Sequence, residues 1–150
     1  MSKPRLVITL GDPAGIGTEV VLKALVDRSL DRYDLTVVGN LQLLTASYQQ
    51  LSSKVELANP QALNIIDVPL DRSIINGVKI GQGNAASGVA SFAYLDLAID
   101  RTLAGEFDAI VTAPIAKSAW LAAGHVYPGQ TELLALKAKI DRFGMMFVGD

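Results

Sequence analysis

The chain alternates between short apolar runs and segments whose apolar residues recur every three or four positions. Apolar runs predict strands at residues 6–10, 34–39, 55–58, 63–68, 108–113 and 143–148, with a short strand at 78–80 inside an irregular stretch. Helical spacing predicts helices at residues 15–28, 41–51, 84–105, 115–123 and 131–140. Strands that are apolar throughout and alternate with helices are typical of a largely parallel sheet with helices on both faces. The sequence therefore predicts an α/β fold.

Three residues in the helical segments carry specific expectations. Asn84 is the predicted N-cap of the longest helix and Gly105 its C-terminal stop, because these residue types favour those positions. Trp120 is expected to pack in the core.

A glycine-rich turn follows the first predicted strand, with Gly11, Gly15 and Gly17 around Asp12. Glycines allow backbone N–H groups to approach a ligand at a helix start; the alternative is a tight turn that needs glycine only for its backbone angles. The spacing matches neither the dinucleotide pattern G-x-G-x-x-G nor the phosphate loop G-x-x-x-x-G-K-[ST]. Asp12 would repel a phosphate, so it is expected to orient a ligand amine or hydroxyl, or to cap the helix.

Two further segments present polar groups where ligands bind in parallel sheets, outside the carboxyl ends of the strands. Lys117 lies in the first turn of a predicted helix, where a cation is unfavourable for the helix dipole. That mismatch points to a function, although a solvated surface lysine is the alternative. Gln130 and Thr131 lie at another predicted helix start, where Thr131 is either a ligand contact or a cap.

Composition narrows the class of protein. The 150 residues suffice for one domain, half of them are hydrophobic, and the mean hydropathy is +0.33. A net charge of −2 predicts no nucleic-acid and no membrane partner. The chain has no Cys and a single His, His125, which is expected to be a loop residue. The lack of Cys fits a reducing cytoplasm, so a cytoplasmic location is expected. The first apolar run is too short for a signal peptide or a membrane span.

Three motifs in the chain resemble the 4-hydroxythreonine-4-phosphate dehydrogenase family of pyridoxal phosphate biosynthesis. They are Thr-Leu-Gly-Asp-Pro-Ala-Gly-Ile-Gly-Thr-Glu at 9–19, Thr-Ala-Pro-Ile-Ala-Lys at 112–117 and Tyr-Pro-Gly-Gln-Thr-Glu at 127–132. The matches occur in the family's order and span the whole chain, and the first is the most specific.

The resemblance implies a two-domain subunit, similar to isocitrate and isopropylmalate dehydrogenases, that forms a homodimer. It implies oxidation of 4-phosphohydroxy-L-threonine by NAD or NADP to 2-amino-3-oxo-4-phosphooxybutanoate, which decarboxylates to 3-amino-2-oxopropyl phosphate. It also implies that Gln130 and Thr131 bind the small phosphorylated substrate. A divalent metal (Zn, Mg or Co) held by three histidines would polarise the reacting oxygen.

The chain departs from the family pattern in two ways. Gln130 stands where most members have His, so it can form hydrogen bonds but carries no charge. Members are roughly twice as long, so residues 1–150 are expected to be the N-terminal portion of an incomplete two-domain enzyme, with the metal ligands beyond residue 150. Lys117 and Asp12 are then the candidate catalytic residues of this chain, and its cofactor-binding residues are not assigned.

Two alternatives to that enzyme remain open. One is a dehydrogenase of a related four-carbon acid, such as threonate or erythronate phosphate. The other is a non-catalytic module that binds a phosphorylated metabolite. Residues 1–150 alone are expected to be inactive as a dehydrogenase. They are also expected to self-associate or to be marginally soluble, because the last predicted strand, within 143–148, leaves a sheet edge or an apolar face unpaired.

Overall fold

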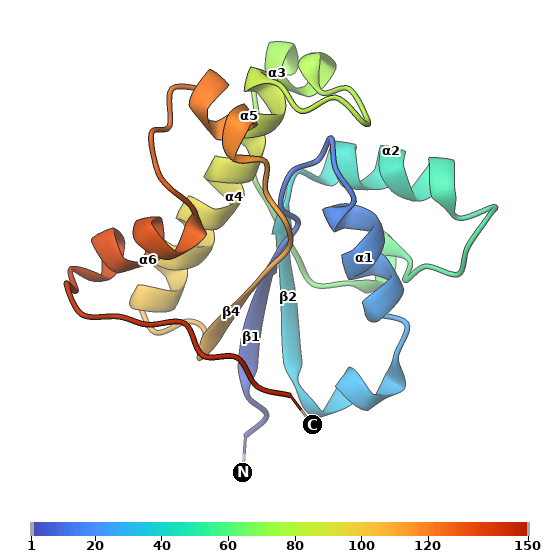
Figure 1. The fold of residues 1–150 in the computed structure, drawn as a ribbon. Coiled ribbons are helices and arrows are strands. Elements are labelled where there is room, and N and C mark those ends of the chain that lie inside the picture. Colours follow the sequence, from blue (N-terminus) through green and yellow to red (C-terminus); the bar gives the residue numbers. More distant parts are fainter. Residues whose placement is uncertain (1, 150) are drawn as a thin grey trace.

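A computed structural model describes residues 2–149. Its centre is a four-stranded parallel sheet in the order β3-β2-β1-β4 (Figure 1). The strands are β1 (Arg5–Thr9), β2 (Asp34–Gly39), β3 (Ile65–Asp67) and β4 (Ala109–Thr112). Thr9 at the end of β1 pairs with Val38 on one side and with Thr112 on the other, so these three strands end at one edge.

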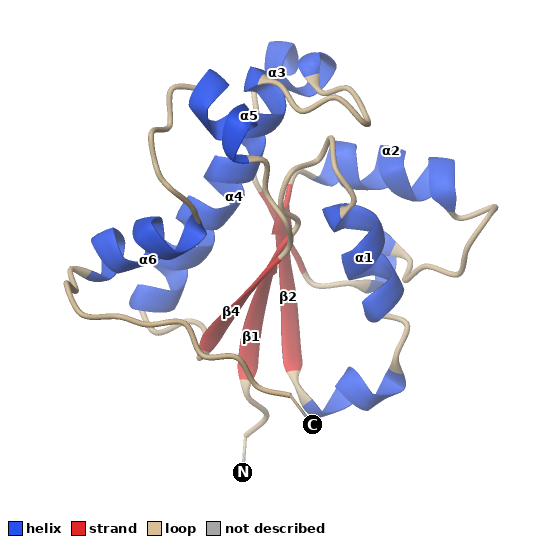
Figure 2. Cartoon of the chain, viewed as in Figure 1, coloured by secondary structure: helices blue, strands red, loops and turns tan. Residues whose placement is uncertain are grey.

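Helices cover both faces of this sheet (Figure 2). On one side lie α1 (Gly17–Ala24) and α2 (Leu41–Leu51), and on the other lies α4 (Ala85–Leu103), against which α5 (Lys117–Ala122) and α6 (Gln130–Ala138) pack. A short α3 (Arg72–Gly77) precedes α4, and two 3₁₀ segments, η1 (Arg28–Arg32) and η2 (Pro60–Ala62), lie in connections. The predicted α/β class is confirmed.

Two apolar clusters hold the layers together. The larger joins the sheet to α1, α2 and α4, and its fully buried members include Val7, Leu22, Leu44 and Tyr94. The smaller lies between α4, α5 and α6 around Trp120, whose indole N–H donates to Ser91 Oγ at 3.0 Å. The expectation that Trp120 packs in the core is confirmed.

The start of α4 is fixed by a reciprocal capping box. Asn84 Oδ1 accepts from the Ser87 N–H, and Ser87 Oγ accepts from the Asn84 N–H, each at 3.1 Å. The predicted N-cap is thus confirmed. At the other end Gly105 has φ +83°, a left-handed conformation that favours glycine, and this confirms the predicted stop.

Two predicted strands between β2 and α4 are wrong. Residues 55–58 form a loop that packs against α1, where the Ala58 N–H donates to Leu22 O at 3.0 Å. Residues 78–80 belong to a tight turn with one isolated bridge, between Lys79 and Gln82, around Gly81 at φ +79°. The irregular stretch before this turn contains α3, which the periodicity does not reveal because the helix has only 6 residues.

The predicted last strand, 143–148, is also wrong. Residues 143–149 carry no strand, and the side chains of Met145, Met146, Phe147 and Val148 are 72–88% exposed. An apolar run becomes a strand only where a neighbouring strand completes the ladder, and no described strand pairs with this segment. Helix ends differ from expectation by a few residues; α1 ends at Ala24, before η1.

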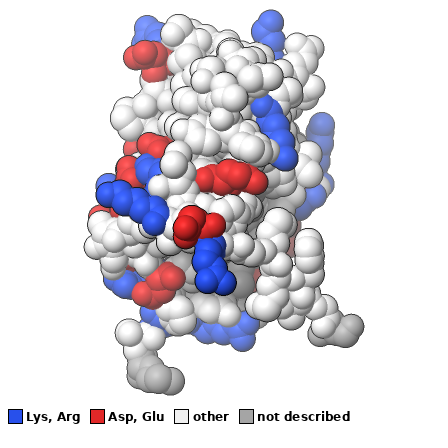
Figure 3. Space-filling model, turned by 60° about the vertical axis from the view of Figure 1, so that its left-hand side comes forward, with Lys and Arg blue, Asp and Glu red and all other residues white. Residues whose placement is uncertain are grey.

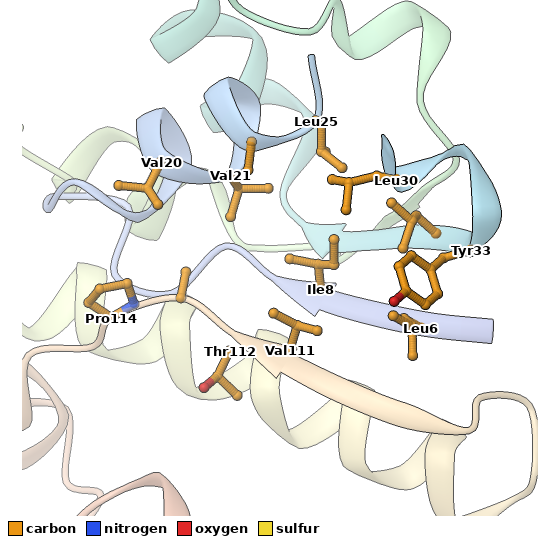
Figure 4. A pocket seen from close by; sticks show the side chains of 13 residues that line it. Leu6, Ile8, Val20, Val21, Leu25, Leu30, Tyr33, Val111, Thr112 and Pro114 are labelled. Atoms are coloured by element: carbon orange, nitrogen blue, oxygen red, sulfur yellow. The ribbon is translucent and has the colours of Figure 1, made fainter. Parts of the chain in front are cut away.

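The face of the sheet beside α1 is hollowed next to the edge strand β4. Figure 4 shows the side chains around this apolar hollow of about 400 Å³, with Val20 and Val21 from α1 opposite Val111 from β4. Val20 and Val111 are 47% and 45% exposed, so the hollow is open to solvent.

Charged side chains of both signs are interspersed on the face of the molecule shown in Figure 3. None of the helices within residues 2–149 is both long and apolar enough to cross a bilayer.

Candidate active site

The candidate site lies where the order of the strands reverses. The chain moves from β1 to β2 and β3 on one side and returns to place β4 on the other side of β1. In open parallel sheets, the crevice outside such a switch point is where ligands bind. Here the segments after β1 and β4 meet, because the Asp12 N–H donates to Pro114 O at 2.9 Å. The first and second sequence motifs therefore form one structural unit.

Two glycines of the first motif serve this close packing. Gly11 has φ +67°, and a Cβ on it would lie 2.2 Å from Pro114 O; a Cβ on Gly17 would lie 2.3 Å from Leu10 O. Both positions need glycine because backbone lies where a side chain would be, and Gly11 also has a backbone angle that favours glycine. Close backbone packing therefore explains these two glycines, and an approach of the turn to a ligand stays a prediction. Gly15 has more space, since a Cβ there would lie 3.4 Å from its nearest neighbour, Asp12 O.

Asp12 is a buried carboxylate at this junction, only 4% exposed. Its Oδ1 accepts from the Ala14 N–H at 2.8 Å, and its Oδ2 lies 3.3 Å from Ser87 Oγ at the start of α4. Asp12 does not cap α1, whose N-cap is Ile16 without a side-chain hydrogen bond, so that option is wrong. Sequence reasoning missed Ser87; the Asn-x-x-Ser capping pattern at 84–87 was the available signal.

Gln130 joins the third motif to the same edge. Its Nε2 donates weakly to Ala113 O at 3.4 Å, and its Oε1 is buried without a hydrogen-bond partner. Thr131 is the second residue of α6, whose N-cap is Gly129 and which has no side-chain cap. Thr131 is therefore not a cap, and its role as a ligand contact stays a prediction.

Lys117 is exposed at the first position of α5 and reaches the loop before α6. A Cβ placed on Gly129 would lie 3.7 Å from Lys117 Nζ and 3.3 Å from Glu132 Oε2. The structure thus places the lysine beside Gly129, the N-cap of α6, and on a different element from Asp12. The start of α6 therefore has both the Lys117 amine and the Glu132 carboxylate beside it, while the Asp12 carboxylate lies in the turn after β1.

A pocket of about 320 Å³ borders Asp12. This volume is at the small end of the range for ligand sites, so it suits part of a ligand rather than a whole dinucleotide. Its walls come from the turn after β1, the loop before α4 and the segment after β4, and they include Asp12, Gly15, Gly83, Pro114, Ile115 and Ala116.

The described residues do not provide a metal site. Within 2–149 there is no group of three or more His, Asp or Glu side chains that could hold an ion. The single histidine, His125, lies in the loop after α5, as expected, with its ring stacked on Phe92 at a centroid distance of 3.6 Å. Burial lowers the pKa of His125 below its ordinary value, and Asp96 opposes this shift. The expectation that metal ligands lie beyond residue 150 stays a prediction.

Comparison with known proteins assigns the family. The family model described as "Pyridoxal phosphate biosynthetic protein PdxA" matches residues 16–150. The chain belongs to the PdxA family. It is 61% identical over 150 residues to a 4-hydroxythreonine-4-phosphate dehydrogenase of Nostoc sp., a match that covers 97% of this chain and 41% of the relative.

Two further PdxA-like proteins extend the comparison. A putative D-threonate 4-phosphate dehydrogenase of Oceanobacillus iheyensis is 34% identical, with 96% of this chain and 46% of the relative covered. The crystal structure of a 4-hydroxythreonine-4-phosphate dehydrogenase from Burkholderia phymatum superposes with a TM-score of 0.85 at 32% identity, covering 99% of this chain and 48% of that one. This PdxA-family chain thus spans less than half the length of these relatives.

Proposed function

We propose that this chain is part of an NAD(P)-dependent 4-hydroxythreonine-4-phosphate dehydrogenase. The enzyme would transfer a hydride from C3 of 4-phosphohydroxy-L-threonine to NAD(P)+ and release the hydroxyl proton. The product, 2-amino-3-oxo-4-phosphooxybutanoate, is a β-keto acid and would lose CO2 to give 3-amino-2-oxopropyl phosphate. The identity of 61% to the Nostoc relative supports this assignment.

One observation in the structure carries the proposal: the three motif segments converge at the switch point. Asp12 is bonded to Pro114, and Gln130 to Ala113, at 2.9 and 3.4 Å. We assign the substrate phosphate to the start of α6, where Gln130 and Thr131 lie beside Lys117, because a helix start and an amine both favour an anion. The Glu132 carboxylate beside Lys117 would have to turn away from the phosphate. Lys117 and Asp12 are the candidate catalytic residues of this chain.

The remaining parts of the site belong to the same proposal. A divalent metal held by residues beyond 150 would act as a Lewis acid on the reacting oxygen, and the active unit would be a homodimer in the cytoplasm. The partners would be the substrate and NAD or NADP, with neither nucleic acid nor membrane.

A second substrate class has its own support. The relative from Oceanobacillus carries the name of a D-threonate 4-phosphate enzyme. Gln130 is uncharged where the resemblance leads one to expect His, which changes the contact at the predicted phosphate end. Dehydrogenation of threonate or erythronate phosphate is therefore the alternative. The remaining alternative is a module that binds a phosphorylated metabolite without catalysis. Such a module would need the residues that contact the ligand but no catalytic residues.

The test is a substrate panel with the full chain that the gene encodes. The formation of reduced cofactor is followed by its absorbance, with NAD+ or NADP+, a divalent metal and each of the three phosphorylated acids. The highest kcat/KM with 4-phosphohydroxy-L-threonine is expected. A preference for threonate or erythronate phosphate would select the alternative enzyme, and ligand binding without any turnover would select the binding module.

A further inference from the structure

Asp12 is only 4% exposed, and it lines the pocket of about 320 Å³ at the switch point. One wall of this pocket is Gly83. A Cβ on Gly83 would lie 3.6 Å from Asp12 Oδ2, so the absence of a side chain there keeps the space over this oxygen free.

The hydrogen bonds of the two carboxylate oxygens are unequal. Oδ1 has a short bond from the Ala14 N–H, at 2.8 Å. Oδ2 has only Ser87 Oγ, at 3.3 Å, and the single hydroxyl proton of Ser87 is also within reach of Asn84 O, at 3.1 Å. A carboxylate can accept about four hydrogen bonds. Oδ2 therefore retains acceptor capacity toward the pocket.

The charge of Asp12 has no cationic partner. Among residues 2–149, no Lys, Arg or His side chain forms an ion pair with it. A buried carboxylate is costly unless it is paired or well hydrogen-bonded. Ser87 is the third residue of α4, so the positive end of this 19-residue helix offsets part of that cost. An uncharged Asn could make the same turn bond, and the turn alone therefore does not explain the charge.

We propose that Asp12 Oδ2 accepts a hydrogen bond from an N–H or O–H donor of the bound ligand, which orients the ligand across the site. The donor end would lie in the switch-point pocket, and the phosphate end would lie at α6 beside Lys117, because a phosphate next to Asp12 would be repelled. This inference rests on the proposed function. The donor has two candidate sources: the ammonium group of the substrate, or the carboxamide or ribose hydroxyls of the nicotinamide cofactor.

The test measures dissociation constants by calorimetry on the full chain that the gene encodes. Asp12→Asn retains an oxygen for the Ala14 N–H but removes the charge. Asp27→Asn is the matched control, since Asp27 Oδ1 accepts from the Ser29 N–H at the same 2.8 Å, in an exposed turn. We expect Asp12→Asn to weaken one of the two ligands by about tenfold or more, the loss of one charge-assisted bond. Asp27→Asn should leave both constants unchanged.

The two ligand arms identify the source of the donor. Weaker binding of 4-phosphohydroxy-L-threonine would identify the substrate ammonium, and weaker binding of NAD+ would identify the cofactor. Inorganic phosphate should bind the variant and the wild type equally. A folded Asp12→Asn variant that binds both ligands within twofold of the wild type would overturn the inference.

Gly83→Ala provides a second variant in case Asp12→Asn fails to fold. Its methyl group would stand at ordinary contact distance from Oδ2 and take up the space of the donor, without disturbing a hydrogen bond of Asp12. It should weaken the same ligand, and unchanged binding would count against the inference. The proposed function is judged separately, by wild-type turnover: a wild type that binds NAD+ but oxidises no substrate refutes that function, while the cofactor arm still decides the role of Asp12. A wild type that binds neither ligand overturns both.

Discussion

Thr131 is predicted to bind the substrate, and no contact within the described structure explains it otherwise. It lies at the second position of α6, it does not cap the helix, and its neighbour Gln130 has an unpartnered buried oxygen. In the full chain that the gene encodes, Thr131→Ala should raise the substrate KM about tenfold or more, equivalent to about 1.4 kcal/mol for one lost polar contact.

Steady-state kinetics measure this effect. Thr102→Ala is the control, because Thr102 Oγ1 bonds only within α4, to Ala98 O at 2.8 Å, and lies on another element. An unchanged KM in Thr131→Ala would remove Thr131 from the substrate site.

His125 makes stability depend on pH. Burial holds its pKa in the folded chain below the ordinary value of 6.5, so the unfolded chain takes up a proton first as the pH falls. Its contribution to stability is present above pH 6.5 and is lost as the pH falls through the lower folded value. Urea unfolding between pH 8 and 5 should show this loss in the wild type.

The variant His125→Gln should show a smaller decrease over the same range, since it removes the titrating ring. Parallel pH profiles for the two proteins would mean that other groups cause the decrease.

At the residue scale, the sequence predicts the local role of a residue better than it predicts which distant residues contact it. The predictions for Asn84 and Trp120 are correct because capping and burial follow from the residue and its local pattern. The contact between Asp12 and Ser87 spans 75 positions and depends on how α4 packs on the sheet. The reason why Gly11 and Gly17 must be glycine cannot be inferred from the spacing of glycines in the sequence. It depends on which backbone atoms lie beside these residues in the folded chain.

At the scale of elements, α4 and α5 pack unusually closely at Gly88. A Cβ on this residue would lie 2.0 Å from Ala119 O, which is a backbone atom of α5. Replacing glycine by alanine within a helix ordinarily gains up to about 1 kcal/mol. Here overpacking should cost about 1–3 kcal/mol or more and exceed that gain, because backbone cannot rotate away.

We therefore expect Gly88→Ala to lower the free energy of unfolding. Trp120 lies in the adjoining cluster, so its fluorescence can follow unfolding in urea. Gly144→Ala serves as the control, since a Cβ there has no atom within 4 Å. A Gly88→Ala variant as stable as the wild type would show that the two helices can separate without cost.

The elements themselves are predictable where both length and periodicity are informative. The bounds of β2 and α2 agree with the sequence, and α4 differs by only a few residues. The strands expected at 55–58 and 143–148 are wrong because an apolar run shows that residues avoid water but not that a partner strand is available. Leu57, within 55–58, avoids water by packing on the core from a loop, without a partner strand.

At the scale of the whole molecule, the inactivity expected of residues 1–150 is a prediction about how the proposed dehydrogenase site is divided along the chain. The described residues hold no group of metal ligands, and the pocket at Asp12 is small for a dinucleotide. The isolated chain should therefore show no dehydrogenase activity with substrate, NAD+ and a divalent metal, measured as reduced cofactor. Turnover close to that of a full-length family member would refute this and the location of the metal ligands beyond residue 150.

The same isolated chain should self-associate. The apolar hollow beside α1 and the exposed side chains of 145–148 present hydrophobic surface to water, although the segment is not a strand. Sedimentation should show oligomers that the substitutions Met146→Lys and Phe147→Lys reduce. Leu136→Lys, at an exposed position on α6, is the control. Monomers at all concentrations would contradict this expectation.

The place of β1 at the centre of the sheet has a consequence for how the chain folds. β2 pairs with β1, and β3 with β2, through shorter crossovers, but β4 pairs with β1 from far along the chain. The Arg5 N–H, for example, donates to Asp108 Oδ2, 103 positions away. Closing so long a loop costs entropy before any contact compensates for it, and such distant pairings slow folding. During synthesis, β1 to β3 can assemble first. The edge of β1 that pairs with β4 then stays without a partner strand until β4 is made. The strand that completes the switch point is therefore the last of the four to arrive.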